Sequence, residues 1–386
     1  MKRRHLLRFP MLFAFLVASP VFAFQVGGAR SAPENGPVAC RFTAAAGIPS
    51  WVTSGVGQDG RFLLVNVHKR DLVELSRTGV AEESRTALGD LFSGSITRIR
   101  QGASKVGDAP PILLELAGGR LFEVDRSLVP RRRIEMATVG LQSQGMHLEM
   151  LLDWIPMGNG QVFGYADLSA GDSLNRANWR NGFVRFDPSR PESFQVISES
   201  LYPGEERISI LAYPPLMASI GSAAFVARIH ENEMGLWRLN ASGSGLLRMR
   251  AFPEHLRGSK ASPKLAPLLP HFSTIEEYPR TMEVSESADM PAGLFAWEDS
   301  LFLLSRTFEH GQRRWYLSKI DPAADRVLWT VRVPGSSHHM MVIPGDQEWA
   351  FLEKGPVTAP LIQTTHNVRF VNSRQMRSLS LKSLCN

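Results

Sequence analysis

The chain has 386 residues, of which 44% are hydrophobic and 21% are charged, and this composition excludes a disordered protein. Its formal net charge is +6, but four basic residues and no acidic residue fall within the first 23 positions, so six minus four leaves +2 for the rest of the chain. No basic stripe with interleaved aromatic residues occurs, and we therefore expect no nucleic-acid partner.

The first 23 residues have the pattern of a secretory signal peptide. A basic start, MKRRHLLR, precedes the apolar stretch FPMLFAFLVASPVFAF, and the small residues Val21 and Ala23 occupy the positions that a signal peptidase requires. This pattern predicts a secreted or periplasmic protein with no stable membrane insertion after cleavage, and residues 24–39 are expected to form an N-terminal linker. The alternative is an uncleaved membrane anchor.

The chain contains two cysteines, and they lie near the two ends of the expected domain. Cys40 directly follows the expected linker, and Cys385 is one residue from the C-terminus. An oxidising compartment permits a disulfide, so we expect these two residues to join the ends of the domain. Two unpaired thiols are the alternative.

Six short apolar strands, each closed by a small polar residue, recur along the chain. An Asp, Asn or Ser side chain at such a position can accept a hydrogen bond from the backbone two residues on and so begin a reversal of the chain. The spacings are 49, 62, 53, 81 and 51 residues, which indicates a repeat with one insertion. The six closing residues are Ser76, Asp125, Asp187, Asn240, Asp321 and Asn372.

Each of these strands has an apolar strand before it, such as FLLVNV or WAFLE, and most have another strand further upstream. A fourth strand is expected after each closing residue, for example VLWTVRV at Val327–Val333 and SLSLKSL at Ser378–Leu384. Four antiparallel strands repeated six times are typical of an all-β, six-bladed β-propeller, which we place at residues 40–386 with a Pro-rich insertion at 253–291. Blade 4 offers two candidates for its first strand, on either side of Pro214 and Pro215.

The strand pattern between Trp51 and Leu384 resembles the six-bladed propeller superfamily that includes NHL-repeat and TolB-like proteins. A narrower resemblance lies in DPAADRVLWTVRVPG, which is similar to the tryptophan-docking repeat of quinoprotein propellers. The other blades lack this motif, so we expect no quinone and no other cofactor, and Trp329 is expected to pack between blades. The basic stretch PRRRIE at Pro130–Glu135 is interpreted as a solvated strand edge, where charge discourages pairing with another chain.

The strand order assigns the connections to two faces of the propeller. Turns between strands 1 and 2 and between strands 3 and 4 lie on one face and are mostly tight. The other connections lie on the opposite face, which we call the long-loop face, and long loops on a rigid scaffold are where function usually sits. The long segments expected on this face are 167–181, 253–291, 306–313 and 354–367.

All nine histidines after the signal peptide are expected in or beside connections of the long-loop face. Some of them could act as general bases or metal ligands, but loops also tolerate histidine without any functional role. These residues are His68, His147, His230, His255, His271, His310, His338, His339 and His366.

Two groups at the starts of blades 3 and 6 border the expected mouth of the central channel. His147 and Glu149 enter blade 3, and His338 and His339 enter blade 6. Imidazole nitrogen and carboxylate oxygen suit zinc or another transition metal. Blades 3 and 6 are opposite each other in a six-fold ring, and neighbouring residues of a strand point to opposite faces, so we expect no metal site.

The first strands of blades 2 and 3 also carry charged residues that are expected to lie near the central channel. The six-bladed relatives that act as lactonases or related hydrolases hold a metal ion there with acidic and Asn side chains, and Glu149 and Asp153 are the acids that we place nearby. Arg98 and Arg100, on the first strand of blade 2, would oppose a cation and suit an anion. The alternative is that nearby carboxylates pair with both arginines.

The sequence contains no G-x-S-x-G elbow, H-E-x-x-H motif, Walker loop or paired C-x-x-C motif. We interpret the chain as an exported, monomeric binding scaffold whose long-loop face engages a protein or an envelope polysaccharide. Aromatic and arginine side chains favour this interpretation because they carry much of the energy of interfaces. Trp315 belongs to this group unless it is part of a strand core. The alternative is a hydrolase or lyase with a site at the channel mouth, and its catalytic residues are not evident from the sequence. The residues expected to bind are His147, Glu149, Trp179, Arg180, Phe308, Arg313, Arg314, His338 and His339.

Overall fold

The computed structural model describes most of the chain between Cys40 and Leu384. The described ranges are 40–45, 52–58, 60–66, 71–76, 81–83, 96–101, 112–116, 120–125, 127–135, 141–143, 145–170, 179–188, 190–199, 215–230, 233–257, 289–335, 337, 339–354 and 366–384. The expected signal peptide and linker lie outside these ranges, as do His68, His271, His338 and Cys385. Within the described ranges, no helix is long and apolar enough to cross a membrane.

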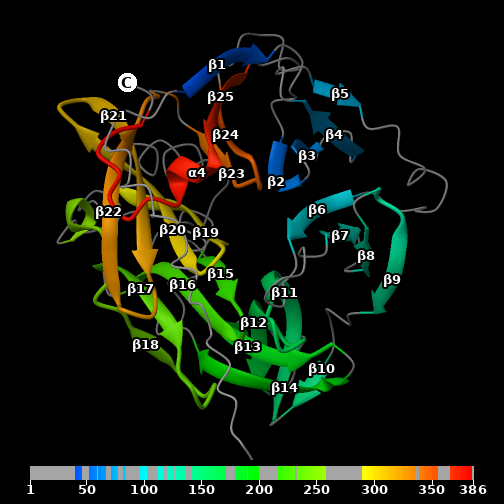
Figure 1. Cartoon of the computed structure of the whole chain (residues 1–386). Helices are drawn as coiled ribbons and strands as arrows, with labels where there is room; N and C mark the ends of the chain where they lie inside the picture. Colours follow the sequence, from blue (N-terminus) through cyan, green and yellow to red (C-terminus); the bar gives the residue numbers. More distant parts are fainter. Residues whose placement is uncertain are drawn as a thin grey trace, which may run out of the picture. The chain divides into compact units, whose positions relative to one another are not determined.

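Six antiparallel sheets form the propeller, and in Figure 1 one strand of each sheet lies toward its centre while the last strand of each blade lies at the outside. The all-β, six-bladed architecture expected from the sequence is thereby confirmed, with a fifth strand added to blade 3. The strands are β2 (Val52–Gln58), β3 (Arg61–Asn66), β4 (Asp71–Leu75) and β5 (Ala81–Glu83) in blade 1; β6 (Ile96–Gln101), β7 (Ile112–Leu116), β8 (Arg120–Val124) and β9 (Pro130–Glu135) in blade 2; β10 (Leu141–Ser143), β11 (Met146–Pro156), β12 (Val162–Ala170), β13 (Trp179–Asp187) and β14 (Arg190–Glu199) in blade 3; β15 (Leu216–Ile220), β16 (Ala223–His230), β17 (Glu233–Leu239) and β18 (Leu246–Arg248) in blade 4; β19 (Met290–Trp297), β20 (Ser300–Glu309), β21 (Gln312–Asp321) and β22 (Arg326–Val333) in blade 5; and β23 (Met340–Ile343), β24 (Glu348–Lys354), β25 (His366–Asn372) and β1 (Cys40–Ala45) in blade 6.

The polar residues that close the third strands start the turns that the sequence predicted. Each third strand ends at the expected residue or one residue before it. Asp321 Oδ1 accepts hydrogen bonds from the backbone N–H groups of Ala323 and Ala324, at 3.0 and 2.9 Å. Asn240 Oδ1 accepts one from the N–H of Ser244 at 2.8 Å. The residues that form these turns therefore mark the repeat, as the periodicity of the strands does.

Blade 6 combines both ends of the described chain. Its outer strand is β1, which pairs antiparallel with β25, with Cys40 opposite Val371 and Ala45 opposite His366. The sequence predicted that residues 378–384 would form this strand, and that prediction is wrong. Hydrogen bonds between the two ends of the domain close the ring, so the last repeat is completed by the first strand of the chain.

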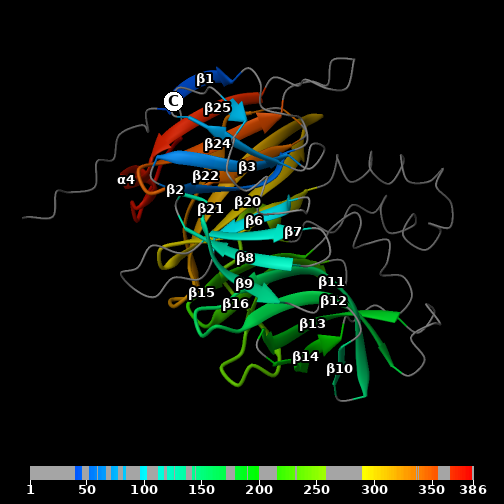
Figure 2. The same ribbon diagram turned by 90° about the vertical axis from the view of Figure 1, so that its right-hand side faces the viewer.

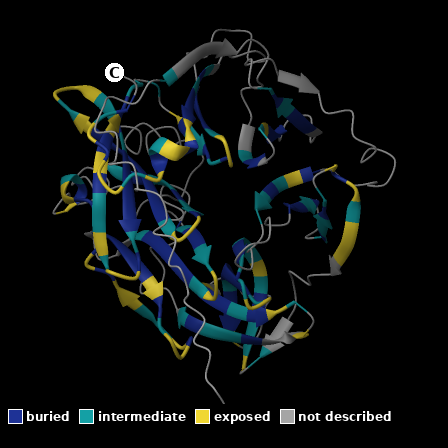
Figure 3. Ribbon diagram, in the orientation of Figure 1, coloured by how far each residue is buried: buried dark blue, intermediate teal, exposed yellow. Residues whose placement is uncertain are grey.

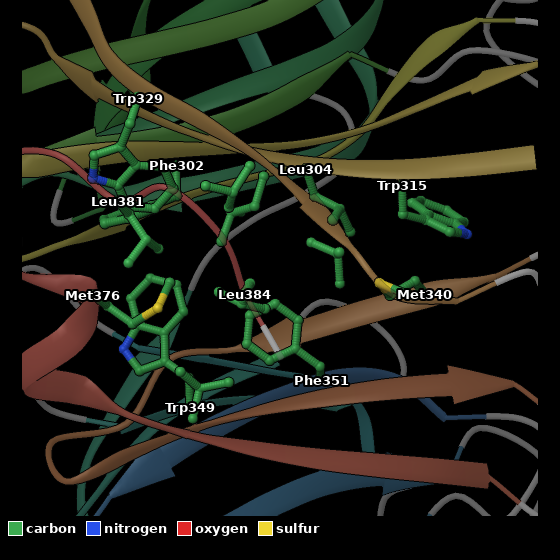
Figure 4. Packing of buried hydrophobic residues seen from close by; sticks show 14 of the residues in the cluster. Phe302, Leu304, Trp315, Trp329, Met340, Trp349, Phe351, Met376, Leu381 and Leu384 are labelled. Carbon is green, nitrogen blue, oxygen red and sulfur yellow. The ribbon is translucent and has the colours of Figure 1, made fainter. Parts of the chain in front are cut away.

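Residues 373–384, which we call the C-terminal segment, lie instead against blades 5 and 6. The segment begins with a single helical turn, α4 (Ser373–Met376), which the side chain of Asn372 caps. Met376, Leu381 and Leu384 are buried in the cluster shown in Figure 4. The segment thus adds a buried apolar layer to the boundary between the two blades.

The hydrophobic core consists of layers between neighbouring blades, seen as dark blue strands in Figure 3. One layer joins tryptophans of blades 5 and 6: Trp297 meets Trp349 edge-on, with ring centroids 5.2 Å apart. Trp329 belongs to the same layer, which confirms its expected packing between blades. Trp315 is 1% exposed, so this side chain is part of the strand core.

β15 follows the proline pair, so the later of the two candidates for the first strand of blade 4 is correct. β9 is the outer strand of blade 2 and its residues 131–133 are exposed, which confirms the solvated edge. Cys40 packs against the cluster that contains Leu384. Its expected bond to Cys385 stays a prediction, because that partner lies outside the described residues.

Candidate functional site

The long-loop face lies on the right-hand side of Figure 2, on the side away from α4. Of the nine histidines assigned to this face, six fall within the described residues. All six lie at the ends of strands or in connections on this face, as the strand order predicted. They are His147, His230, His255, His310, His339 and His366.

Residues 306–313 do not form the long loop that the sequence predicted. β20 continues to Glu309, β21 begins at Gln312, and the connection is the pair His310 and Gly311, with φ angles of 51° and 74°. Two consecutive positive φ angles make a two-residue turn whose twist matches that of the flanking strands. We call residues 305–316 the blade 5 hairpin, and it is a rigid projection of the sheet.

The blade 5 hairpin brings together three residues that were expected to bind. Phe308 pairs directly with Arg313 across the two strands, and Phe308 is 41% exposed. The guanidinium of Arg314 lies 2.6 Å from the carboxylate of Glu309. That carboxylate also accepts a hydrogen bond from Tyr316 Oη at 3.3 Å. The hairpin therefore presents the exposed Phe308 ring opposite Arg313 on one face of its sheet, while Glu309 holds Arg314 on the other face.

His255 joins this network from the segment that follows blade 4. β18 is three residues long, and residues 249–257 fill the space beyond it. They include a single 3₁₀ turn (Glu254–Leu256). The Nε2 atom of His255 lies 2.8 Å from the Oγ of Ser305, and its ring packs against Tyr316 with centroids 4.5 Å apart. A residue within the expected insertion at 253–291 thus completes a polar cluster on blade 5.

Burial favours the neutral form of the His255 ring. Burial lowers the pKa of His255 below its ordinary value, and the carboxylates of Asp289 and Glu309 act in the opposite direction. Ser305 is completely buried, so its hydroxyl does not face an approaching substrate. The contact between His255 and Ser305 therefore positions the imidazole and does not present a nucleophile.

A groove of about 500 Å³ runs along the rim of the propeller between blades 4 and 5, and we call it the rim groove. One wall is the segment after β18, and the other is the outer strand β22. No sequence pattern indicates this groove, because its arginines come from two segments that are about 75 residues apart. Its lining includes Arg250, His255, Arg257, Asp325, Arg326 and Thr330.

A second group of expected binding residues gathers at one end of blade 3. His147 pairs with Ser169 across β11 and β12, and Ser169 pairs with Trp179 across β12 and β13. Residues that are directly opposite share a face of the sheet, so these three positions form one row. Ser169 Oγ also donates a hydrogen bond to the carboxylate of Glu149, and Arg180 is exposed beside the row.

The charged residues of the inner strands pair with one another between blades 2 and 3. Arg98 Nη1 lies 2.6 Å from Oδ1 of Asp153 and 3.6 Å from the carboxylate of Glu115, and Arg100 donates a hydrogen bond to the same Asp153 oxygen. Burial lowers the pKa of Arg100, and Asp153 opposes that shift. The guanidinium of Arg100 also stacks over Trp154 at 5.5 Å from the ring centroid. The expected alternative, pairing with nearby carboxylates, is confirmed.

The expected binding residues therefore do not form one site. They fall into a blade 3 group and a blade 5 group, and the exposed His339 directly precedes β23 in blade 6. The network of His255, Tyr316 and Glu309 is not evident from the sequence, because His255 lies in a 3₁₀ turn far along the chain from the hairpin that carries the other two residues. In the part of the chain that the structure describes, no three His, Cys, Asp or Glu side chains are arranged to hold a metal ion.

Comparisons with known proteins give only distant similarities. No protein-family model and no curated protein matches the chain. A gluconolactonase from Xanthomonas campestris is similar with a TM-score of 0.44 and 11% identity, covering 86% of this chain and 89% of that one. A Bacteroides fragilis protein assigned as exported gives 0.40 and 11%, covering 89% and 97%, and the Dos1 propeller gives 0.32 and 7%, covering 82% and 69%. These scores carry no argument about function, and the propeller assignment rests on the six sheets themselves.

Proposed function

We propose that this protein is an exported, monomeric binding scaffold whose blade 5 hairpin engages a protein partner on the long-loop face. The observation that carries the proposal is the 41% exposed ring of Phe308, directly opposite Arg313 on the hairpin. Exposed aromatic and arginine side chains are enriched at the energetic centres of protein interfaces. An envelope polysaccharide, the other ligand class expected from the sequence, is an outcome of the test below.

The hairpin is suited to binding because its conformation is set before a partner arrives. Its strands are paired along their whole length, and Glu309 holds Arg314 at 2.6 Å. A preorganised surface loses less conformational entropy on association than a flexible loop does. We do not propose the alternative of a hydrolase or lyase at the channel mouth, because two arginines already engage the Asp153 carboxylate there.

Site-specific photo-crosslinking in the cell envelope of the source organism tests this proposal. A photoreactive phenylalanine analogue replaces Phe308, and a matched variant carries the analogue at Leu379, which is 72% exposed and lies three residues beyond α4, the helical turn on the opposite side of the propeller. We expect one discrete protein adduct from position 308 and none from position 379. The partner, once identified by mass spectrometry, is then expected to bind the Phe308→Ser variant at least about tenfold more weakly.

Three results would contradict the proposal. A carbohydrate adduct without protein at position 308 would assign the face to the polysaccharide instead. Identical adducts from both positions, or none at position 308, would show that the hairpin is not a binding surface.

A further inference from the structure

The rim groove collects arginine side chains whose charges are not neutralised by acidic side chains. Arg257 donates hydrogen bonds to two backbone carbonyls, from Nε to Phe252 O at 3.0 Å and from Nη2 to Arg250 O at 2.7 Å. These acceptors are uncharged, so they hold the guanidinium and leave its charge in place. Within the described ranges, Arg250, Arg257 and Arg326 have no ion pair with an acid.

Asp325, an acid in the lining of the groove, binds backbone N–H groups. The carboxylate of Asp325 accepts hydrogen bonds from the backbone N–H groups of Arg250, at 3.0 and 3.1 Å, and of Ala251, at 3.0 Å. Asp325 has a φ angle of 48°, a left-handed conformation that Asp tolerates better than most residues. It thereby fixes one wall of the groove to the other, and two backbone amides partly offset its negative charge.

We propose that the rim groove binds a small organic anion, with Arg250 and Arg326 holding its phosphate, sulfate or carboxylate group. A guanidinium presents several N–H donors in one plane, and this geometry matches the oxygens of such groups. The groove volume of about 500 Å³ lies within the range of small-molecule sites.

The remaining lining of the groove would contact the uncharged body of the ligand. Val327 supplies an apolar surface, and the hydroxyl of Thr330 lies 2.8 Å from that of Ser318, which fixes its position on β22. His255 forms part of the same lining, and its ring is held by Tyr316. Because the groove lies on the rim and not at the tip of the blade 5 hairpin, this inference does not depend on the proposed protein partner.

Isothermal titration calorimetry at neutral pH with glucose 6-phosphate, inorganic phosphate and glucose tests the proposal. We expect glucose 6-phosphate to bind most tightly, inorganic phosphate to bind more weakly because it lacks the organic body, and glucose not to bind. The double variant Arg250→Gln/Arg326→Gln should weaken glucose 6-phosphate binding by about tenfold or more. The matched control is Arg132→Gln/Arg374→Gln, which removes the same charge from two exposed positions elsewhere, and its affinity should change less than about twofold.

A substitution of Glu254 should change the affinity for glucose 6-phosphate in the opposite direction. Glu254 is an exposed acid in the lining of the groove, so Glu254→Gln should tighten binding of glucose 6-phosphate by about twofold to fivefold. The control Asp346→Asn removes an exposed acid from a turn of blade 6 and should leave the affinity unchanged.

The following results would overturn the inference. Equal weakening by both double variants would mean that the net charge of the whole protein attracts the anion, with no specific site. Equal affinity for glucose 6-phosphate and inorganic phosphate would show that the groove does not recognise the organic part of the ligand. Equal affinity for glucose 6-phosphate and glucose would show that it does not recognise the anionic group. The absence of any binding up to about 10 mM would show that the groove is not a ligand site.

Discussion

Two cations at different blade boundaries, the buried Lys319 and the half-buried Arg100, are stabilised in different ways. Lys319, between blades 5 and 6, donates from Nζ to the backbone carbonyls of Met376 at 3.2 Å and Arg377 at 3.0 Å. Arg100, between blades 2 and 3, donates to the carboxylate of Asp153. Burial is the largest cause that lowers the pKa of each cation, so both positions carry a desolvation cost.

The difference shows how each boundary is held together. The acceptors of Lys319 belong to the C-terminal segment, so this cation is satisfied only when that segment is docked. The same segment is bound by Trp329, whose Nε1 donates to Ser378 O at 2.9 Å, and by Arg377, whose guanidinium lies 2.7 Å from Glu298. The ion cluster of Arg100 needs only the neighbouring blade. The boundary that closes the ring therefore depends on the chain end, whereas the other boundary depends on side chains of consecutive repeats.

Removal of the C-terminal segment should have the largest effect on the boundary between blades 5 and 6. A chain that ends at Asn372 loses the buried side chains of Met376, Leu381 and Leu384 and leaves Lys319 without its carbonyl acceptors. We expect the free energy of unfolding in urea to fall by at least about 5 kcal/mol, or the protein not to fold.

A variant within the same segment provides the control for this truncation. Leu379 is 72% exposed, so Leu379→Ser should change the free energy of unfolding by less than about 0.5 kcal/mol. A truncated protein with the stability of the full chain would show that the segment does not hold the ring closed.

The predicted disulfide between Cys40 and Cys385 would reinforce the same boundary. Reduction should lower the free energy of unfolding by about 2–4 kcal/mol, because the bond restricts the unfolded chain. Urea titrations with and without reductant measure this difference, and the reductant should have no effect on a Cys40→Ser variant. Non-reducing mass mapping that finds both thiols free would refute the bond.

Asp153→Asn is the corresponding test of the boundary between blades 2 and 3. It leaves Arg98 and Arg100 without their shared carboxylate, and their side chains are 29% and 21% exposed. We expect a loss of about 2–3 kcal/mol in urea denaturation, less than for a completely buried pair because solvent reaches these groups. Asp346→Asn, an exposed acid, is the control and should have no measurable effect. An equal effect of the two variants would argue against the ion cluster.

Lys319→Met removes the donor between blades 5 and 6 and nearly conserves the volume of the side chain. The carbonyls of Met376 and Arg377 then lose their charged partner, and we expect a loss of about 1–2 kcal/mol in urea denaturation. Lys382→Met, in an exposed position of the same segment, is the matched control and should be close to neutral. A stabilised Lys319→Met protein would mean that the desolvation cost exceeds the value of these hydrogen bonds.

The pH dependence of stability should show the smallest effect. Because burial lowers the pKa of Lys319 in the folded chain below the ordinary value of 10.5, the unfolded chain holds more protons between those two pKa values. The contribution of this residue to stability therefore rises with pH in that alkaline window. Urea titrations across the window should show this rise for the wild type relative to Lys319→Met. A constant difference between the two proteins would contradict the shift.

The repeat could be predicted from the sequence because the residues that form each turn are close together in the chain. Asp321 and Asn240 close their strands with hydrogen bonds to N–H groups within four residues, so the residues that make the turn are neighbours in the chain. The hairpin turn at His310 and Gly311 is equally local, but the sequence predicts a long loop there, because His is a less common partner of Gly in such turns than Asn or Asp. The group at the end of blade 3 was anticipated only as separate residues.

The six repeats, the inter-blade position of Trp329 and the face on which the histidines lie were predictable from the amino-acid pattern alone. These features follow from alternation along strands and from turns closed within a few residues. Three features became evident only from the folded chain: β1 completes blade 6, the C-terminal segment covers Lys319, and Arg250 and Arg326 line one groove. Each of these depends on contacts between segments tens to hundreds of residues apart, and the free energy of such contacts comes from burial and charge pairing that no local pattern of residues encodes.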